Sequence, residues 1–492
     1  MNRRTFLKNV GAAMSVMAIP GCASGVVKTS NVDNGPKLNF IFFLVDDLGW
    51  ADLGCYGSKF YETPNIDRLA AQGMKFTDAY ADCPVCSPTR ASIMSGKYST
   101  RLHLTNFDGL AGPSKKLKPP KTTGDLPLEE LTIAEAMKQA GYTTYFAGKW
   151  HIGHEEKYHP QHQGFDINIA GHRAGQPGSY YYPYKHPVHT WSNVPGLEDG
   201  KPGEYLTNRL ADESVKFLDT VGDKPFFLYH CFYSVHTPIE PRKDLAEKYK
   251  SKLEDMPKSQ GPSYITVEGK KVRQVQDNPD YAAMVAAVDE SVGRILSKVD
   301  QLGLGENTAI IFMSDNGGLF GVTSNLPLRA GKSWLYEGGI REPMIIKWPS
   351  VVNASSTCHE PVISTDFYPT ILEMAGLKQR PSQHLDGVSL VPLLKGNGNG
   401  KLDREAIFWH YPHYHSLGNT PAGAVRSGDY KLIEFYEDFN VELYNLKDDI
   451  GEKNNLAEKM PQKVNELRDI LHKWRKEVNA QMPTPNPGYK PK

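Results

Sequence analysis

The sequence predicts an α/β fold, with a mostly parallel sheet flanked by helices and a smaller C-terminal α+β domain. Apolar runs rich in Ile, Val and Phe, typical of strands buried on both faces, alternate with segments of helical periodicity over most of the chain. Such alternation is typical of strands joined by crossover helices. Beyond residue 395 the pattern changes to short strand-like pieces and one polar helix, which indicates a separate small domain.

In the main domain, the expected strands are far enough apart for helices to connect them. They cover residues 39–45, 142–147, 226–232, 308–314 and 344–348. Helical periodicity covers residues 65–72, 132–140, 204–218, 281–302 and 366–375. The Gly- and Asn-rich segment 395–401 is typical of a linker, so we expect the main domain over 37–395 and a C-terminal domain over 402–492. In the latter we expect a helix over 461–479 and strands at 406–410, 423–426, 430–435 and 442–445.

The first 21 residues have the features of an export signal. The pair Arg3-Arg4 resembles a twin-arginine signal, and the apolar run over 10–19 is too short to span a membrane. The motif Ile-Pro-Gly-Cys that ends at Cys22 resembles a lipobox; plain cleavage after a small residue is the alternative. We expect a bacterial protein that is periplasmic or anchored through lipid on Cys22, with 22–36 as a linker. No later segment is apolar for long enough to cross a membrane.

Charge and cysteine content exclude several classes of protein. The 492 residues hold 56 Lys and Arg against 56 Asp and Glu, so the chain lacks the overall positive field of a general nucleic-acid binder. Removal of the expected signal takes away three positive charges and leaves the chain slightly acidic. Six cysteines in this length are too few for a disulfide-stabilised fold.

Two of the expected strands end in acidic residues. Asp46 and Asp47 follow the strand 39–45, and Asp315 and Asn316 follow the strand 308–314. In a parallel sheet both ends lie at the carboxyl edge, and buried acids there are costly unless they share a cation. Oxygen ligands without His or Cys suit Ca²⁺ or Mg²⁺ rather than Zn²⁺. The alternative is two solvated turns, because Asp-Asn-Gly is ordinary turn chemistry.

The segment 83–96 carries the most specific chemistry. Cys83 and Cys86 have the spacing of a redox pair or of half a zinc site, but the chain has no second pair and no thioredoxin-like context. Ser87 as N-cap and Pro88 at the first helical position predict a helix that starts just after Cys86. Cys86 then lies at the positive end of a helix, with Arg90 one turn further on. That arrangement predicts an anion site with a reactive side chain in it.

The sequence Cys-Ser-Pro-Thr-Arg over 86–90, continued by Ala-Ser and Ser-Gly, resembles the Cys-x-Pro-x-Arg motif of type I sulfatases. Residues 148–153 resemble the Lys/His motif of that family, and 234–238 resemble the segment that bears its second active-site His. Lys332, just before 336–343, resembles its sulfate-binding Lys. The order and spacing of the blocks agree over nearly the whole mature chain, which also resembles bacterial polysaccharide sulfatases.

The resemblance implies an alkaline-phosphatase-like α/β domain that hydrolyses sulfate monoesters, a sulfuric ester hydrolase. It also implies that a maturation enzyme, formylglycine-generating or sulfatase-maturating, oxidises Cys86 to 3-oxoalanine, known as formylglycine. The implied cofactor is Ca²⁺, with Mg²⁺ possible. The implied metal ligands are Asp46, Asp47, Cys86, Asp315 and Asn316. The implied sulfate-binding residues are Lys149 and Lys332, and the catalytic residues are Cys86, Arg90, His151 and His236.

Each of these groups has a defined role in the mechanism that the resemblance implies. The metal ion, Arg90, Lys149 and Lys332 neutralise the sulfate oxygens while a hydroxyl of the aldehyde hydrate attacks sulfur. His236 protonates the leaving sugar oxygen as a general acid. His151 then takes the proton from the second hydroxyl, which expels sulfate and restores the aldehyde.

The expected substrate is a sulfated carbohydrate, a polysaccharide or its oligosaccharides. Aromatic and basic loops at His172-Arg173, 180–182 and 410–415 are expected to bind sugar, chiefly through His172, Arg173, His410 and His413; ordinary loop packing is the alternative. We expect His230 to be a core residue and His154, His159 and His162 to lie in a polar loop.

Three other functions stay open from the sequence. One is a sulfatase of small aryl esters. A phosphatase or phosphodiesterase of the same superfold would normally have a Ser or Thr nucleophile and a two-metal site with His ligands. A catalytically inactive glycan-binding protein would lack the nucleophile or a metal ligand, yet every expected position is filled.

Overall fold

The computed structural model describes residues 37–107, 114–257, 261–267 and 269–490. Residues 37–492 form one compact unit. The expected signal over 1–21, the linker over 22–36 and Cys22 lie outside the described residues. In the described part of the chain, no helix has both the length and the apolar character needed to cross a membrane.

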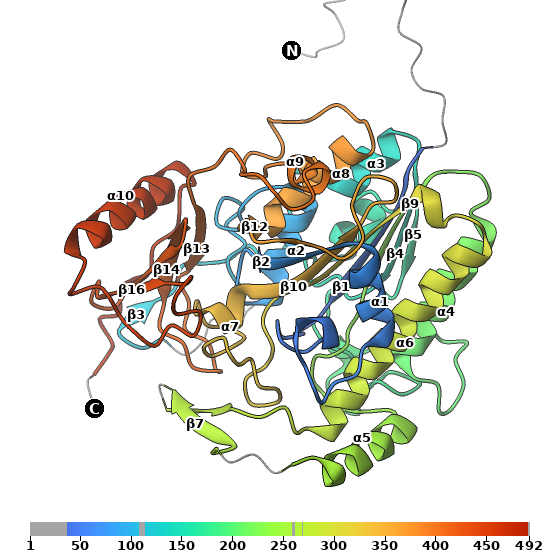
Figure 1. Ribbon diagram of the computed structural model, residues 1–492, viewed down its shortest axis with the longest axis horizontal. Coiled ribbons are helices and arrows are strands. Elements are labelled where there is room, and N and C mark those ends of the chain that lie inside the picture. The colour runs from blue at the N-terminus through green and yellow to red at the C-terminus, as the bar shows by residue number, and fades with distance from the viewer. Residues whose placement is uncertain (1–36, 108–113, 258–260, 268, 491–492) are drawn as a thin grey trace, which may run out of the picture. The chain divides into compact units, whose positions relative to one another are not determined.

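A nine-stranded sheet forms the centre of the described unit (Figure 1). Its order is β11-β2-β10-β9-β1-β6-β4-β5, with β12 also paired to β2. One half contains β1 (Asn39–Val45), β4 (Thr143–Gly148), β5 (Ile167–Ile169), β6 (Phe226–Cys231) and β9 (Thr308–Ser314), all parallel. The other half contains β2 (Met74–Tyr80), β10 (Arg341–Lys347), β11 (Ser356–Cys358) and β12 (Val362–Ile363). Only β10 runs antiparallel to its neighbours, so the predicted mostly parallel sheet is confirmed.

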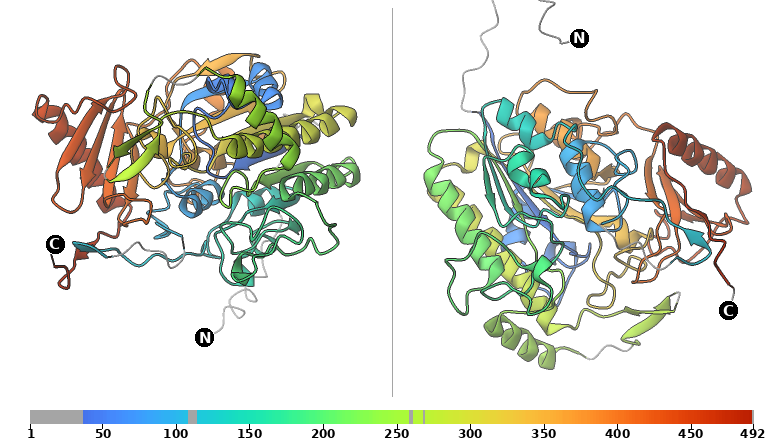
Figure 2. Two further views of the ribbon diagram at one scale, coloured as in Figure 1. Left: turned by 90° about the horizontal axis from the view of Figure 1, so that it is seen from below. Right: turned by 180° about the vertical axis from the view of Figure 1, so that it is seen from behind.

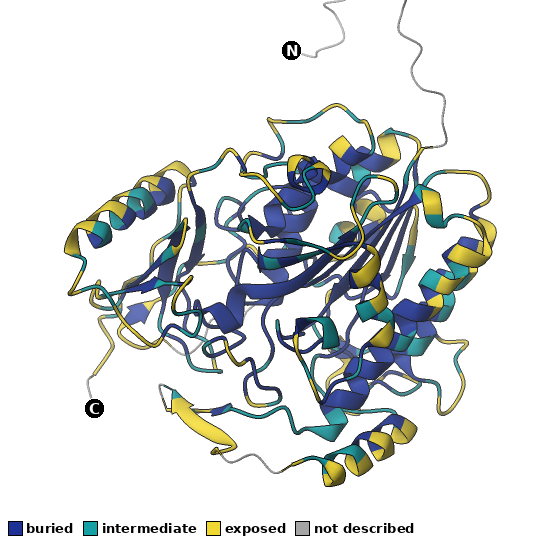
Figure 3. Ribbon diagram, in the orientation of Figure 1, coloured by how far each residue is buried: buried dark blue, intermediate teal, exposed yellow. Residues whose placement is uncertain are grey.

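Helices cover both faces of this sheet (Figures 1 and 2). One layer consists of α1 (Pro64–Gln72), α4 (Leu206–Thr220), α5 (Lys243–Asp255) and α6 (Pro279–Gln301). The other consists of α2 (Cys86–Ser95), α3 (Ile133–Gln139), α8 (Phe367–Met374) and α9 (Val391–Lys395). In β1, Ile41 and Phe43 belong to the first core, whereas Phe40 and Phe42 belong to the second. The strand is apolar throughout because both of its faces are buried (Figure 3).

The C-terminal domain is an antiparallel sheet with one helix. Its strands pair in chain order: β13 (Ile407–Tyr411), β14 (Ala422–Ser427), β15 (Tyr430–Phe435) and β16 (Val441–Asn445). The sheet lies between α10 (Pro461–Glu477) and the main domain (Figure 2). Leu467 and Trp474 of α10 share a core with Trp409 of the sheet and with Tyr80 and Ile340 of the main domain. The two domains are therefore joined by a continuous apolar contact.

Short elements complete the described chain. The hairpin β7 (Tyr264–Val267) and β8 (Lys270–Arg273) follows α5, and α7 (Glu337–Ile340) leads directly into β10. β3 (Leu117–Lys118) pairs with β17 (Thr484–Pro485), so the end of the chain returns to the main domain.

A buried ion cluster also joins the domains. Lys431 of β15 donates to Glu337 of α7 at 2.8 Å and to Glu452 at 2.9 Å, and all three side chains are inaccessible to solvent. Burial raises the pKa of Glu452 to about 7. Burial also opposes ionisation of Glu337, but Lys431 and Arg341 outweigh it and lower the pKa of Glu337 to about 2. One lysine therefore stabilises the charge at the start of α7, a few residues after Lys332.

We predict that Lys431→Met lowers the free energy of unfolding by about 3–5 kcal/mol, because it leaves buried Glu452 without its cation and Glu337 with Arg341 alone. Urea denaturation of the purified protein measures this change. Lys447→Met is the matched control, since Lys447 lies exposed just after β16. Equal stability of the two variants would show that the cluster contributes nothing to the joint between the domains.

Candidate active site

The acidic residues after β1 and β9 meet, as their strand positions predict. Val45 and Ser314 are register partners at the ends of the two parallel strands. Beyond them, the Asp47 backbone N–H donates to Asp315 Oδ1 at 3.3 Å, and Asn316 Nδ2 donates to Asp47 Oδ1 at 2.8 Å. Asp46, Asp47, Asp315 and Asn316 are all buried. Asp47 has a positive φ of 59°, a backbone conformation uncommon outside Gly and typical of functional sites.

Cys86 lies at the N-terminus of α2, as predicted, but Ser87 is not the cap. The helix includes Cys86, and Val85 holds the N-cap position without a side-chain hydrogen bond. Ser87 lies within the first turn, and its hydroxyl donates instead to the backbone carbonyl of His151 at 2.7 Å. This bond ties the start of α2 to the loop after β4.

Arg90, one turn into α2, anchors the helix to the acidic cluster. Its Nε and Nη2 donate to Asp315 Oδ2 at 2.8 and 2.6 Å, and its Nη1 donates to the Lys149 carbonyl at 2.6 Å. The guanidinium is buried, with an exposed fraction of 2%. Charge-assisted bonds of this kind are among the strongest in proteins, so Arg90 fixes α2 relative to β9.

Two lysines neutralise the other carboxylates. Lys149 Nζ lies 2.6 Å from Asp46 Oδ2, and Lys332 Nζ lies 2.6 Å from Asp47 Oδ1. Lys149 directly follows β4, where Gly148 has a φ of 102° and a Cβ would lie 1.8 Å from the Cys231 carbonyl oxygen. Only glycine fits there, and this close approach brings Lys149 against β6.

The residues of the cluster fit a hard divalent cation. One ligand atom each of Asp46, Cys86 and Asp315 lies within 4.8 Å of the others, and the same holds for Asp46, Asp47 and His236. Within the described chain, Asp46 Oδ1 and Asn316 Oδ1 are buried without a hydrogen-bond partner. Burial, opposed by Lys149 and reinforced by Asp315 and Asp47, raises the pKa of Asp46. A bound cation would satisfy the unpaired oxygens and offset the repulsion between the carboxylates.

Two histidines face this cluster from different loops. His151 Nδ1 lies 3.2 Å from Cys86 Sγ, and burial together with Lys149 and Arg90 lowers the pKa of His151. His236 Nδ1 donates to the Thr237 carbonyl at 2.9 Å, which leaves Nε2 directed at Asp47 Oδ2, 3.7 Å away. Burial and then Lys332 lower the pKa of His236 to about 3. Both imidazoles are therefore neutral near pH 7 and available for proton transfer.

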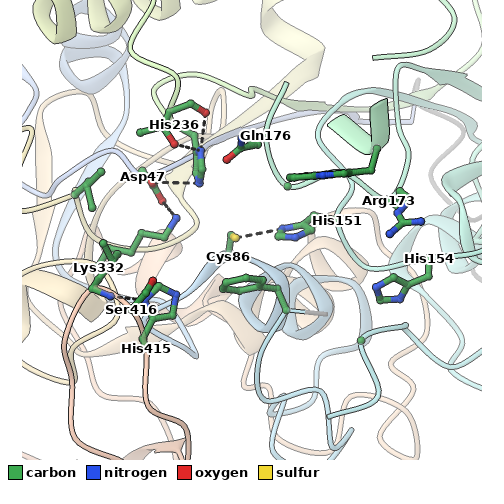
Figure 4. Close-up of a pocket in the computed structure, with 18 residues that line it drawn as sticks. Asp47, Cys86, His151, His154, Arg173, Gln176, His236, Lys332, His415 and Ser416 are labelled. Carbon is green, nitrogen blue, oxygen red and sulfur yellow. Dashed lines mark hydrogen bonds and ion pairs between the residues drawn. The ribbon is translucent and has the colours of Figure 1, made fainter. Parts of the chain in front are cut away.

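A cavity of about 570 Å³ opens over Cys86 (Figure 4). This volume lies within the range of about 300–1,000 Å³ that is usual for small-molecule sites. The lining side chains come from the strand ends, from α2, from the loops after β4 and β5, and from the C-terminal domain. The lining residues include Asp47, Cys86, Phe107, His151, His154, Arg173, Gln176, Trp191, His236, Lys332, His415 and Leu417.

Of the four residues expected to bind sugar, only Arg173 lines the cavity. His172 is buried behind it, and its backbone carbonyl accepts the His151 N–H at 3.2 Å. His410 and His413 are also buried: His410 contacts the Tyr436 hydroxyl at 2.7 Å, and His413 contacts the Thr105 hydroxyl at 2.7 Å. The expectation that these three histidines contact substrate is wrong in the described structure. The His413 ring joins the C-terminal domain to the main domain, the His410 ring contacts Tyr436 and Gln481 within the C-terminal domain, and the His172 ring accepts the Ala174 N–H within its own loop.

The Tyr-rich segment 180–182 also supports the scaffold. Tyr180 is buried, and its hydroxyl donates to the carbonyls of Tyr233 and His236 at 2.6 and 2.9 Å. It therefore supports the loop that carries His236 rather than a sugar. His230 is a core residue, as expected, with its ring against the Ser214 hydroxyl at 2.8 Å.

Sequence analysis did not single out His415, which brings the C-terminal domain into the cavity. Its Nδ1 accepts the Leu417 N–H at 3.1 Å, so the neutral ring carries its proton on Nε2 and can donate. Burial and then Lys332 lower the pKa of His415 to about 4. Phe107 lies between His415 and His151, with ring centroids 5.6 and 5.9 Å away. His415 ends the His- and Tyr-rich stretch, but no periodicity in that stretch marks which ring faces the cavity.

His154 was expected in a polar loop and also lines the cavity. Its Nδ1 lies 2.8 Å from Asp125 Oδ1. Cys83 is buried, and all five cysteines of the described residues are free, so Cys83 and Cys86 do not form a redox disulfide. The described metal-ligand clusters contain Cys86 but not Cys83, which also argues against a zinc half-site.

Fold and site together define an α/β protein whose pocket places Cys86 at a helix N-terminus beside buried cations and a metal-compatible acidic cluster. The family model Sulfatase matches residues 38–377, and the model described as N-sulphoglucosamine sulphohydrolase, C-terminal, matches residues 330–481. The chain belongs to the sulfatase family and is a sulfuric ester hydrolase.

Curated relatives and solved structures agree. The chain is 36% identical to a sulfatase of Formosa agariphila, over 87% of this chain and 86% of that protein. It is 34% identical to the N-acetylgalactosamine-6-sulfatase of Rattus norvegicus, over 80% of this chain and 70% of that protein. The structure of Ps i-CgsB in complex with k-i-k-neocarrahexaose has a TM-score of 0.72 at 29% identity and covers 92% of this chain and 94% of that one. A protein solved with its substrate D-glucosamine-2-N,6-O-disulfate has a TM-score of 0.70 at 26% identity, with coverage of 90% and 98%.

Proposed function

We propose that this sulfatase hydrolyses sulfate monoesters of carbohydrates, with formylglycine made from Cys86 as its nucleophilic residue. The observation that carries the proposal is the position of Cys86. It lies at the N-terminus of a buried helix, 3.2 Å from a neutral His151 and beside an acidic cluster that fits a metal ion. A maturation enzyme would have to convert the thiol before the protein can act.

Two groups would complete this site: the formylglycine made from Cys86 and a divalent metal ion. Formylglycine, as its hydrate, supplies an oxygen nucleophile whose sulfated form can collapse, whereas a sulfated thiol would have no comparable exit. Ca²⁺, or Mg²⁺ in its place, supplies positive charge that polarises the ester and favours ionisation of the nucleophile. Asp46, Asp47, Asp315, Asn316 and residue 86 would hold it, because their oxygens converge with two of them unpaired.

The chain's own cations bind and orient the sulfate group. Lys332 Nζ lies at the cavity wall and Lys149 Nζ lies beneath it, each now bonded to a carboxylate of the cluster. Arg90 holds Asp315 and the Lys149 carbonyl in place. Fixed positive groups in a buried site stabilise developing negative charge without reorganisation.

The two histidines move the protons. His236 Nδ1–H is fixed by the Thr237 carbonyl, so Nε2 is the atom that protonates the leaving oxygen. His236 must take up a proton at Nε2 before this transfer; Asp47, 3.7 Å from Nε2, and the charge of the sulfate group favour the imidazolium against the burial and the Lys332 charge that oppose it. His151 Nδ1 faces residue 86 and takes a proton there when sulfate is released.

A carbohydrate substrate is supported by the walls of the cavity and by the relatives. Aromatic and polar side chains, among them Trp191, Gln176 and His415, line the space next to Cys86. Relatives are named N-acetylgalactosamine-6-sulfatase, and two similar structures hold saccharides. A phosphatase is disfavoured because the nucleophile position is Cys and the acidic cluster is oxygen-rich. Aryl sulfates remain substrates that the same chemistry would accept.

We also propose export. The signal-like segment over 1–21 motivates this, with Cys22 as the lipid-bearing residue of an anchored form. A folded sulfatase moved by a twin-arginine route would be modified at Cys86 in the cytoplasm before transport.

We predict that residue 86 of the purified active protein is the aldehyde rather than Cys. Peptide mass spectrometry should show the loss of mass that accompanies conversion of the thiol to the aldehyde. Cys86→Ala abolishes sulfate release, because no nucleophile remains. Cys83→Ala is the matched control and retains activity, since that buried thiol lies outside the cluster. Full activity of Cys86→Ala would exclude the mechanism.

We predict that His236→Ala lowers kcat by about 10²–10⁴-fold on a sugar sulfate, the usual contribution of a general acid. The loss should be smaller on an aryl sulfate, because a phenolate leaves without full protonation. His162→Ala, on an exposed loop, leaves both rates unchanged. An equal loss on the two esters would assign His236 to binding rather than to proton transfer.

We predict that the protein, stripped with EDTA, binds one Ca²⁺ per chain and is stabilised against heat by about 2.7 kcal/mol at a hundredfold excess over Kd. Asp46→Asn weakens binding, because it removes a charged ligand; Asp125→Asn, outside the cluster, does not. Calorimetric titration measures both. Unchanged affinity in Asp46→Asn would place the ion elsewhere.

A further inference from the structure

We propose that Arg173 binds a second anionic group of the substrate, carried by the sugar next to the one that bears the scissile sulfate. This inference rests on the proposed function and names its substrate class more closely: saccharides with at least two anionic groups.

Arg173 is a cation with no partner among the residues that the structure describes. Its side chain is exposed and lines the cavity, yet among the described residues none forms an ion pair or a hydrogen bond with it. The other cations of the site, Arg90, Lys149 and Lys332, each contact a carboxylate. Among the described lining residues Asp47 is the one carboxylate, and Lys332 already pairs with it. Among the described residues, nothing therefore compensates the positive charge at this end of the cavity.

The position of Arg173 favours a role away from the scissile sulfate. In Figure 4, His151 separates Arg173 from Cys86. The loop is fixed to His151: the His172 carbonyl accepts the backbone N–H of His151 at 3.2 Å, and a Cβ on Gly175 would lie 2.3 Å from Cε1 of the His151 ring. A group bound by Arg173 is thus held at a set distance beyond the catalytic histidine. It must be a different group of the same substrate.

Between Cys86 and Arg173, the cavity offers an aromatic surface on which a sugar ring can lie. Trp191 lines the same cavity with 47% of its side chain exposed, although a large apolar ring is normally buried. Exposed aromatic rings beside polar groups are typical of binding sites. His154 lies near Arg173 in Figure 4, but Asp125 already engages its Nδ1. Arg173 is therefore the group at this end that is available for an anion.

The chemistry of the side chain selects the ligand. A guanidinium presents paired N–H groups that match two oxygens of a sulfate or carboxylate, and it stays charged at all relevant pH values. A neutral sugar would leave this charge unused. A sulfate or a uronate carboxylate on the neighbouring sugar supplies the matching oxygens.

The test compares three disaccharides with the same scissile sulfate. Their neighbouring sugar carries a second sulfate, a uronate carboxylate or no charge. For each one, kcat/KM is measured by release of inorganic sulfate with the mature wild type and with Arg173→Gln, Arg173→Lys and Lys185→Gln. Lys185 is the matched control, because it is an exposed cation near the cavity that does not line it.

We expect the wild type to prefer one charged disaccharide over the neutral one, and the preferred anion identifies the source of the charge. Arg173→Gln should lower that preference by about 10- to 100-fold, the usual effect of a lost hydrogen bond to a charged group. The change should lie mainly in KM. Arg173→Lys should restore part of the preference, and Lys185→Gln should keep all of it.

Equal losses on charged and neutral disaccharides in Arg173→Gln would overturn the inference, because they would indicate a structural role. An equal loss of preference in Lys185→Gln would also overturn it, because the effect would then be general charge attraction. If the wild type hydrolyses the esters without preferring a charged neighbour, this inference fails and the proposed function stands. If it releases sulfate from none of them and from no aryl sulfate, the proposed function fails as well.

Discussion

Three buried carboxylates, Asp46, Asp47 and Asp315, lie against three buried cations at the carboxyl ends of β1 and β9, and the rest of the site depends on that pairing. Each pair ties a different segment to the sheet. Arg90 brings α2 and with it Cys86, Lys149 brings the loop after β4 and with it His151, and Lys332 brings the loop before α7. The cost of burying these charges is offset only when every member is present, so the reacting groups are positioned by the same contacts that stabilise the edge of the sheet.

The C-terminal domain takes part in this arrangement in two ways. Lys431 holds Glu337 at the start of α7, shortly after Lys332, by an ion pair that is inaccessible to solvent. His415 comes from the loop between β13 and β14 and forms a wall of the cavity with a neutral, donating Nε2. The main domain therefore supplies the chemistry, while the C-terminal domain fixes one side of the space in which a substrate binds.

Much of the fold followed from apolar periodicity, because β1, β6 and β9 are buried on both faces and α4, α6 and α10 are long and amphipathic. β2 was missed because Lys75, Thr77 and Asp78 interrupt its apolar pattern, and β10 was not recognised as antiparallel because strand direction is not encoded locally. The cluster at the strand ends was predictable from topology alone. The sequence did not predict that His415, rather than His410 or His413, faces the cavity. That outcome depends on the path of one irregular loop next to Phe107.

The environment of Cys86 argues against the thiol itself as the nucleophile. Reactive cysteines in enzymes have a depressed pKa, which yields the thiolate at neutral pH. Here burial raises the pKa of the Cys86 thiol; Lys149 and Lys332 act in the opposite direction, and Asp46 and Asp315 add to the rise. A site built for thiolate chemistry would not place carboxylates around the sulfur. A site that holds a cation would, because the same carboxylates would bind that cation, which would supply positive charge to an oxygen nucleophile at residue 86. The surroundings of residue 86 are thus better matched to an oxygen nucleophile than to the residue that the gene encodes.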